Sequence, residues 1–281
     1  MPELPEVETM RRGIARVAGC AIRDFRRPRS RLQSITITPP PSEFRRRVVG
    51  RRIVGVGRIG KRIVLELNSG DRIVLAPRMA GLVLLADPPD RGHLRVVFEL
   101  SGLAKQLLFW DRRGLGVVRL VSAAEFEGRY GPKKIGPDAL EISAAELRSR
   151  LAASRRAIKV ALLDQRAVAG IGNIYASEML HRSGIHPAKP CNRLSPPEWR
   201  RLHAQMGKVL REAIRRQGST LRDNTYRPAR DEPGEYEFRV YQRDGQRCGR
   251  CGRGEIVRIV QAQRSTFFCP ACQRDVGRGA C

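Results

Sequence analysis

The chain has 281 residues, which is long enough for two domains that each bury a core. Its composition is that of an ordinary globular protein, and it contains no run of about 18 apolar residues that could span a membrane. The first residues, MPELPEVETM, lack the basic segment and apolar stretch of a secretory signal. These features predict neither a membrane-spanning nor a secreted protein, and we expect a cytoplasmic one.

Charge is the most informative bulk property. Lysine and arginine number 54 against 28 acidic residues, which gives a net charge of +26 and an isoelectric point near 11.2. This excess favours a polyanionic partner, most often the phosphate backbone of nucleic acid. An arginine-rich codon bias is the alternative explanation for part of the excess.

The first half of the chain predicts one helix followed by β structure. Apolar residues at helical spacing predict a helix over residues 5–17. Strands over 62–67 and 72–75 indicate a hairpin around a turn at 68–71. Strands over 94–100 and 106–110 repeat the pattern, and 116–121 adds another. Residues 1–128 are therefore predicted to form an N-terminal β-sandwich or barrel with a leading helix.

The second half changes to a helical period. Residues 128–137 contain two Gly-Pro pairs and are predicted to be a linker without regular structure. Helices are expected over 143–154, 158–163 and 173–182 and from 195 onward, with strands over 256–260 and 266–269. The resulting fold class is a multidomain α+β protein, with domains at 1–128, 129–236 and 237–281.

Four of the seven cysteines have metal-ligand spacing. Cys248 and Cys251 form one CxxC pair, and Cys269 and Cys272 form a second. Four thiolates fill the tetrahedral coordination of one structural Zn²⁺ and leave no open position for catalysis. Several arginines surround these cysteines, so a DNA-binding finger is favoured over a zinc ribbon that contacts proteins.

A short glycine-rich turn precedes one of the predicted helices. Residues 170–173 read Gly-Ile-Gly-Asn, and their backbone N–H groups could hold a phosphate at the helix N-terminus. Asn173 could cap that helix. A plain helix-turn-helix connection is an equally good interpretation.

The N-terminus offers a candidate nucleophile. Removal of Met1 would leave the secondary amine of Pro2, with Glu3 and Glu6 close by on one helical turn. An α-amino group has a pKa of about 7.7–8.0, so part of it is nucleophilic at neutral pH. Such an amine can attack a sugar C1′ to form an iminium, while a carboxyl group moves protons. The alternative is that both glutamates merely favour a helix start.

Three segments together resemble the bacterial formamidopyrimidine-DNA glycosylase family. They are MPELPEVETMRRG at 1–13, AGIGNIYASEMLHRSGIHP at 169–187 and AQRSTFFCPAC at 262–272. The resemblance implies an N-terminal β-sandwich, a helix–two-turns–helix domain and a C-terminal zinc-finger hairpin. It also implies a monomeric DNA-repair enzyme that acts on double-stranded DNA containing oxidised bases or abasic sites.

The resemblance assigns roles residue by residue. Pro2 resembles the nucleophile, Glu3 the proton-transfer residue and Lys61 the catalytic-site lysine near the lesion and its phosphate. Without the resemblance, Lys61 would be interpreted as a solvated charge at a strand edge. Glu6 and Arg222 correspond to lesion-pocket residues. The implied DNA contacts are Met79, His93, Arg113, Leu115, Lys159, Asn173, Tyr241 and Arg264.

The sequence departs from the family pattern in two places. Residues 111–116 read Asp-Arg-Arg-Gly-Leu-Gly where the family commonly has Asp-Pro-Arg-Arg-Phe-Gly, and Ala76-Pro77 replaces the usual His-Leu. These changes are expected to alter how the opposite base is contacted. Two other functions stay open: an endonuclease VIII-like enzyme for oxidised pyrimidines, and a noncatalytic zinc-ribbon DNA-binding protein.

Overall fold

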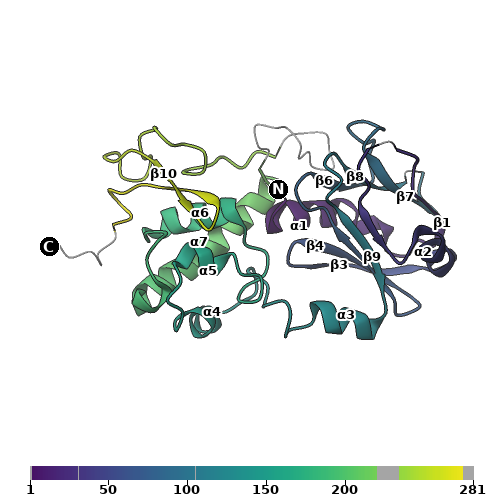
Figure 1. Cartoon of the computed structure of the whole chain (residues 1–281), viewed down its shortest axis with the longest axis horizontal. Helices are drawn as coiled ribbons and strands as arrows, with labels where there is room; N and C mark the ends of the chain where they lie inside the picture. Colours follow the sequence, from purple (N-terminus) through teal and green to yellow (C-terminus); the bar gives the residue numbers. More distant parts are fainter. Residues whose placement is uncertain (1, 31, 105, 220–233, 275–281) are drawn as a thin grey trace. The chain divides into compact units, whose positions relative to one another are not determined.

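The computed structural model describes residues 2–30, 32–104, 106–219 and 234–274 (Figure 1). The chain divides into two compact units: unit 1 comprises residues 1–134 with 213–236, and unit 2 comprises residues 135–212 with 237–281. The predicted α+β class is confirmed by the helices and sheets of both units. The boundaries predicted at 128 and 236 stay predictions.

Unit 1 begins with helix α1 and contains two sheets. Helix α1 spans Leu4–Gly13 and is followed by a 3-10 helix at Ala15–Val17, where the sequence predicts one continuous helix. One sheet has the order β1-β7-β8-β6, and the other has the order β2-β9-β5-β4-β3. The first sheet consists of β1 (Ile22–Arg26), β6 (Gly81–Leu84), β7 (Leu94–Leu100) and β8 (Leu107–Asp111). The second consists of β2 (Thr36–Thr38), β3 (Ile53–Ile59), β4 (Arg62–Leu67), β5 (Arg72–Ala76) and β9 (Val117–Val121).

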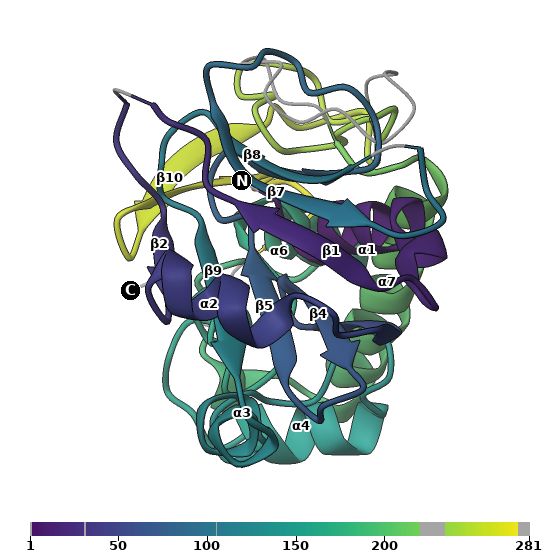
Figure 2. The same cartoon turned by 90° about the vertical axis from the view of Figure 1, so that its right-hand side faces the viewer.

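The two sheets form a sandwich around one core. Buried side chains of both sheets and of α1 belong to a single apolar cluster, which includes Met10, Phe25, Leu65 and Phe98. Figure 2 shows β1, β7 and β8 in one layer and β4, β5 and β9 in the other. Helix α2 (Pro41–Val48) contributes Phe44, whose ring stacks on that of Phe25 at 4.3 Å. The predicted sandwich is thus confirmed, and α1 is one of its structural members.

The predicted linker at 128–137 is wrong in its first three residues. Helix α3 spans Ala123–Tyr130, so Gly128 lies inside a helix. Ser122 and Glu125 form a capping box, in which Ser122 Oγ accepts from Glu125 N and Glu125 Oε2 accepts from Ser122 N. The capping box stabilises the start of the helix and offsets the cost of one interior glycine, which is about 1 kcal/mol.

Unit 2 contains the predicted helices. They are α4 (Ala144–Leu151), α5 (Ile158–Leu162), α6 (Asn173–Ser183) and α7 (Pro196–Arg215), and the last residues of α7 belong to unit 1. A two-stranded antiparallel hairpin follows, made of β10 (Val257–Gln261) and β11 (Arg264–Phe268). Its small core groups Val240, Ile256 and Phe267 with two of the cysteines. No helix within the described residues is long and apolar enough to cross a bilayer.

Candidate active site and zinc centre

Helix α1 holds the predicted nucleophile at its start. Pro2 directly precedes Glu3, which is the N-cap residue, and Glu6 Oε2 accepts a hydrogen bond from Glu3 N at 2.8 Å. Pro5 lies in the first turn, where a missing N–H costs nothing. Glu3 and Glu6 are 1% and 2% exposed. The backbone beside Pro2 is therefore held in place by the first turn of α1, which Glu3, Pro5 and Glu6 stabilise.

Glu6 also binds a distant part of unit 1. Its Oε1 accepts hydrogen bonds from Ser219 N at 2.9 Å and from Ser219 Oγ at 3.2 Å. Ser219 follows α7 and is itself buried. The carboxylate thus joins the N-terminus to the chain that returns to unit 1 after α7. No motif in the sequence pointed to Ser219.

Pro2 and Lys61 line one pocket of about 360 Å³, called the Pro2 pocket below. Lys61 lies in the two-residue turn between β3 and β4, where Gly60 has a φ of 53°. A glycine in this conformation lets the hairpin close directly at Lys61. Met79 lines the same pocket, so three residues that the sequence assigns to the site are brought together. The other lining residues are Arg62, Ala76, Arg78, Val117 and Arg119.

The Pro2 pocket is positively charged. Lys61 and three arginines line it, and among the described residues no carboxylate does. Burial lowers the pKa of Arg62, and the neighbouring charges of Arg78 and Arg119 lower it further, although Tyr130 opposes them. The guanidinium of Arg62 also lies over the Tyr130 ring, 5.5 Å from its centroid. Such a lining suits an anion such as a phosphate of DNA.

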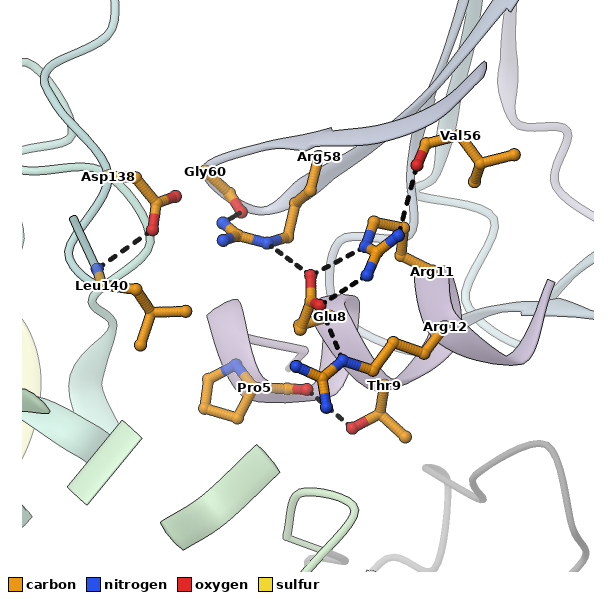
Figure 3. Close-up of polar contacts among 10 residues, drawn as sticks. All are labelled: Pro5, Glu8, Thr9, Arg11, Arg12, Val56, Arg58, Gly60, Asp138 and Leu140. Atoms are coloured by element: carbon orange, nitrogen blue, oxygen red, sulfur yellow. Dashed lines mark hydrogen bonds and ion pairs between the residues drawn. The ribbon is translucent and has the colours of Figure 1, made fainter. Parts of the chain in front are cut away.

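Glu8 ties α1 to the turn that carries Lys61 (Figure 3). Its carboxylate accepts hydrogen bonds from Arg11 at 2.8 and 2.9 Å, from Arg12 at 2.8 Å and from Arg58 at 3.1 Å. Arg58 also donates to Gly60 O at 3.0 Å. The sequence analysis missed Glu8 and Arg58. The spacing of Glu8 to Arg11 and Arg12 on one helix face was the available signal.

The protonation of Glu8 follows from these contacts. Burial alone would raise its pKa, but the hydrogen bonds from Arg11, Arg12 and Arg58 outweigh burial and lower the pKa to about 2. Glu8 is therefore ionised at neutral pH although its side chain is buried. Its charge is compensated by three guanidinium groups, one of which reaches the turn before Lys61.

The loop that carries Arg113 and Leu115 is organised by Asp111. This buried carboxylate accepts from Arg113 N at 3.0 Å and from Gly116 N at 2.6 Å. Gly114 has a φ of 65°, and a Cβ added there would lie 2.4 Å from Gln33 O. No side chain fits at Gly114 in this conformation, so the loop as built here requires glycine at this position.

Two apolar residues assigned by resemblance are exposed. Met79 is 39% exposed and Leu115 is 37% exposed. A Met or Leu side chain near a strand is usually buried in the core, so this exposure is unusual. Met79 lies in the turn at 77–81, which is closed by a hydrogen bond from Gly81 N to Pro77 O at 2.8 Å. The Ala76-Pro77 departure falls at the start of this turn. Exposed apolar side chains on ordered turns are available to contact bases.

Three of the predicted DNA contacts meet in unit 2. Asn173 Oδ1 accepts from Lys159 Nζ at 2.7 Å, and Asn173 Nδ2 donates to Ser265 O at 3.0 Å and to the Tyr241 hydroxyl at 3.5 Å. The suggestion that Asn173 caps α6 is wrong, because Gly172 is the N-cap residue and Asn173 is the first helical residue. Its side chain joins the helix start to β11.

Lys159 is 1% exposed, and its ammonium donates to Asn173, Ser265 O and Thr266 Oγ1. Arg264 is exposed at the start of β11 beside this cluster. His93 lies elsewhere, in unit 1, where Nδ1 is 2.8 Å from Asp90 Oδ1. Arg222 lies outside the described residues. The DNA-binding roles of these residues stay predictions.

The four cysteines of the CxxC pairs form a metal centre. Their sulfur atoms all lie within 4.8 Å of one another. Hydrogen bonds from the backbone of Arg253 and Gly254 lower the pKa of Cys251 to about 6, whereas burial and the neighbouring sulfurs raise that of Cys272 to about 12. Four cysteine sulfurs this close match the tetrahedral ligand set of one Zn²⁺, which would hold all four as thiolates. Unit 2 also places His181 Nε2 3.3 Å from Cys248 Sγ.

Comparisons with known proteins agree with this arrangement. The family model described as the formamidopyrimidine-DNA glycosylase N-terminal domain matches residues 1–118, and the corresponding H2TH domain matches 135–225. The chain belongs to the formamidopyrimidine-DNA glycosylase family. The zinc finger found in that family and in isoleucyl-tRNA synthetase matches residues 245–274. The four-cysteine centre is accordingly the zinc site of a DNA-glycosylase finger.

Relatives of the family are similar over nearly the whole chain. The formamidopyrimidine-DNA glycosylase of Chloroflexus aggregans is 41% identical over 97% of this chain and 98% of its own. A Lactococcus lactis Fpg variant, solved with DNA containing Fapy-dG, has a TM-score of 0.85 at 34% identity and covers 97% of this chain and 100% of its own. The Fpg protein of Thermus thermophilus has a TM-score of 0.83 at 35% identity, covering 97% and 98%. Its membership makes this chain a DNA glycosylase.

Proposed function

We propose that the chain is a bifunctional DNA glycosylase and AP lyase that removes oxidised purines from double-stranded DNA. Solved relatives were captured with DNA containing Fapy-dG, an abasic site or carbocyclic 8-oxoguanine. The observation that carries the proposal is the meeting of Pro2 and Lys61 in one cationic pocket. We further propose that the enzyme acts as a cytoplasmic monomer.

The first chemical step is base displacement. Once Met1 has been removed, the Pro2 amine attacks C1′ of the damaged nucleotide, and the bond from C1′ to the base breaks. Glu3 protonates the sugar as its ring opens, which leaves an iminium between Pro2 and C1′. Lys61 and its arginine neighbours hold the phosphate beside the lesion.

The second step is strand cleavage. Loss of a proton from C2′ of the iminium expels the 3′ phosphate, and a further elimination expels the 5′ phosphate. Hydrolysis of the remaining iminium then frees Pro2. Because the electron sink is the iminium itself, Zn²⁺ has a structural role only.

The remaining residues hold the DNA. A lesion must leave the base stack to reach an amine in a pocket, and the gap must be filled. We assign that role to Met79, Leu115 and Arg113, and phosphate binding to Arg264 and the Asn173 cluster. Glu6 and Arg222 complete the lesion pocket.

Borohydride trapping tests the proposal. The zinc-loaded chain is incubated with duplex DNA containing 8-oxoguanine opposite cytosine, with and without borohydride, after intact mass has verified that Met1 is absent. We expect a covalent adduct with reductant and strand cleavage without it. Pro2→Gly should lower base excision by at least about tenfold, because the primary amine of glycine replaces the secondary amine of proline, and the adduct of the parent chain should map to its N-terminal residue.

Lys133→Ala is the matched control, since Lys133 is an exposed lysine outside the Pro2 pocket. It should give the adduct in full. Mapping the adduct to a peptide containing Lys61 would reject Pro2 as nucleophile. Trapping on an oxidised pyrimidine but not on 8-oxoguanine would instead favour the endonuclease VIII-like function.

A further inference from the structure

Unit 2 contains a second pocket that the proposed chemistry does not use. Its volume is about 330 Å³, and it lies at the end of α6 opposite to Asn173. Four arginines line it together with His181, Gln205 and Gly249, and no carboxylate is among these residues. The four, which define the arginine pocket, are Arg182, Arg239, Arg243 and Arg250.

The charge of the arginine pocket is largely uncompensated. Arg182 pairs with Glu212 at 2.7 Å, but none of the other three has an ion pair within the described part of the chain. Guanidinium groups match the oxygen atoms of phosphate in a bidentate manner and are weakly hydrated. Three guanidinium groups without a carboxylate partner around one hollow therefore favour a multiply charged oxyanion.

Two of these guanidinium groups are held in place by their own surroundings. Arg243 donates from Nε to Gln246 Oε1 at 2.7 Å and from Nη1 to Phe238 O at 3.0 Å. Arg250 donates from Nη1 to Cys272 O at 3.4 Å and lies against Gly184. A site whose cations are already ordered loses less conformational entropy when a ligand binds.

A buried polar atom gives independent support for a ligand. His181 is 1% exposed, and Nδ1 has no hydrogen-bond partner within the described residues, whereas Nε2 faces Cys248 Sγ. An unsatisfied buried polar atom is unfavourable, so it marks a place where a partner is missing. A hydrogen phosphate group serves either protonation state of Nδ1, because it offers both P–O⁻ and P–OH.

We propose that the arginine pocket binds inorganic phosphate or a phosphate monoester. His181 lies eight residues after Asn173, which is about 12 Å along α6, so this pocket is separate from the predicted DNA-phosphate cluster. The terminal phosphate of a cleaved DNA strand and a free phosphorylated metabolite share the required chemistry. A phosphodiester carries only one negative charge and has no P–OH, so it matches the three guanidinium groups less well.

Isothermal titration calorimetry of the zinc-loaded full chain with inorganic phosphate tests the proposal. We expect one site with a Kd below about 1 mM. Arg239→Ala should weaken it by at least about tenfold, which corresponds to the loss of one charge-assisted hydrogen bond. Arg200→Ala, an exposed arginine on α7, is the matched control and should leave the Kd unchanged.

His181→Phe is the second variant, and its zinc content is measured first because His181 lies beside Cys248. With zinc retained, it should also weaken phosphate binding. Competition by 5′-phosphorylated DNA but not by the same unphosphorylated duplex would identify a strand end as the source. Binding unaffected by either duplex would identify a free ligand.

Three results would overturn the proposal. They are the absence of heat at about 10-fold above the expected Kd, equal weakening by Arg200→Ala and Arg239→Ala, and full competition by unphosphorylated duplex. The last result would make the pocket a contact for the DNA backbone. None of these readouts depends on glycosylase activity, so the outcome is independent of the function proposed above.

Discussion

At the scale of single residues, two buried glutamates of α1 have different connections. Glu6 binds Ser219 after α7, and Glu8 binds Arg58 before the turn of Lys61. The Pro2 end of the helix is therefore fixed from two sides, by one carboxylate each. Correct placement of a nucleophile within a fraction of an ångström depends on such supporting contacts.

Glu8→Gln should make the protein less stable at neutral pH and less sensitive to acid. The folded pKa of Glu8, about 2, lies below its ordinary value of 4.5. Ionised Glu8 therefore contributes stability above pH 4.5, and this is lost as the pH falls through 2. The shift corresponds to about 3 kcal/mol, so we expect the variant to lose about 2–3 kcal/mol at pH 7. Urea unfolding between about pH 7 and pH 2.5 measures the difference.

Glu66→Gln makes the same charge change on β4, where Glu66 is exposed and lies 4.0 Å from Arg72. It should cost less than about 0.5 kcal/mol. A constant gap between Glu8→Gln and the parent chain at every pH would show that the effect comes from packing and not from the ionised carboxylate.

Sequence reasoning named residues that the structure brings together, and it missed the residues that support them. Pro2 has a rare position and the four cysteines a fixed spacing, whereas Lys61 was assigned only through the family resemblance. Arg58 is one of many arginines, and Ser219 is far from Glu6 in the chain, so only the fold brings either to its partner. The burial of Lys159 was also beyond reach, because its three oxygen partners come from α6 and β11.

At the scale of elements, the sequence predicted correctly those helices and strands that have a clear apolar periodicity or a clear turn. The hairpin of β4 and β5 has its predicted turn at 68–71, and α4 to α7 match their predicted positions within a few residues. The elements that were not predicted are β1, β2, β3, β6, α2 and α3. Two of them show why. Helix α2 is arginine-rich and has only Phe44 and Val48 buried, and β2 is three residues long. Their positions depend on packing against neighbouring strands.

The zinc hairpin should depend on its metal. One Zn²⁺ per chain is expected by elemental analysis, and Cys248→Ser should lower this to well below about half, because the four sulfurs form one site. DNA affinity should fall by at least about tenfold, since Arg264 is carried by the same hairpin. Fluorescence anisotropy with labelled duplex measures the affinity.

Cys20→Ser is the appropriate control, because Cys20 belongs to unit 1 and is not part of the metal centre. It should retain both zinc and affinity. If Cys248→Ser also kept its zinc, the metal would be bound elsewhere than in the four-cysteine centre.

At the scale of the whole molecule, the net charge of +26 predicts strongly salt-dependent DNA binding. Each phosphate neutralised by a cation contributes about −0.9 to the slope of log K against log salt. Arg264→Ala should therefore weaken binding and make the slope shallower by about one unit. Anisotropy titrations between about 50 and 200 mM salt measure this.

Leu115→Ala tests the contribution of base contacts to DNA affinity separately from that of phosphate contacts. This side chain is exposed and apolar, so its loss should weaken binding to lesion-containing DNA without changing the slope. An unchanged slope for Arg264→Ala would remove this arginine from the set of phosphate contacts.

The path of the chain through its two units has a consequence for biosynthesis. The chain leaves unit 1 after residue 134 and returns to it at residue 213, where it supplies Ser219 to Glu6. A ribosome delivers the N-terminus first, so the sandwich strands emerge well before the serine that α1 requires. The glutamate beside Pro2 lacks its second hydrogen-bonding partner until about four-fifths of the protein has been translated. A nascent chain can thus display a processed proline while its reactive end is still incompletely assembled.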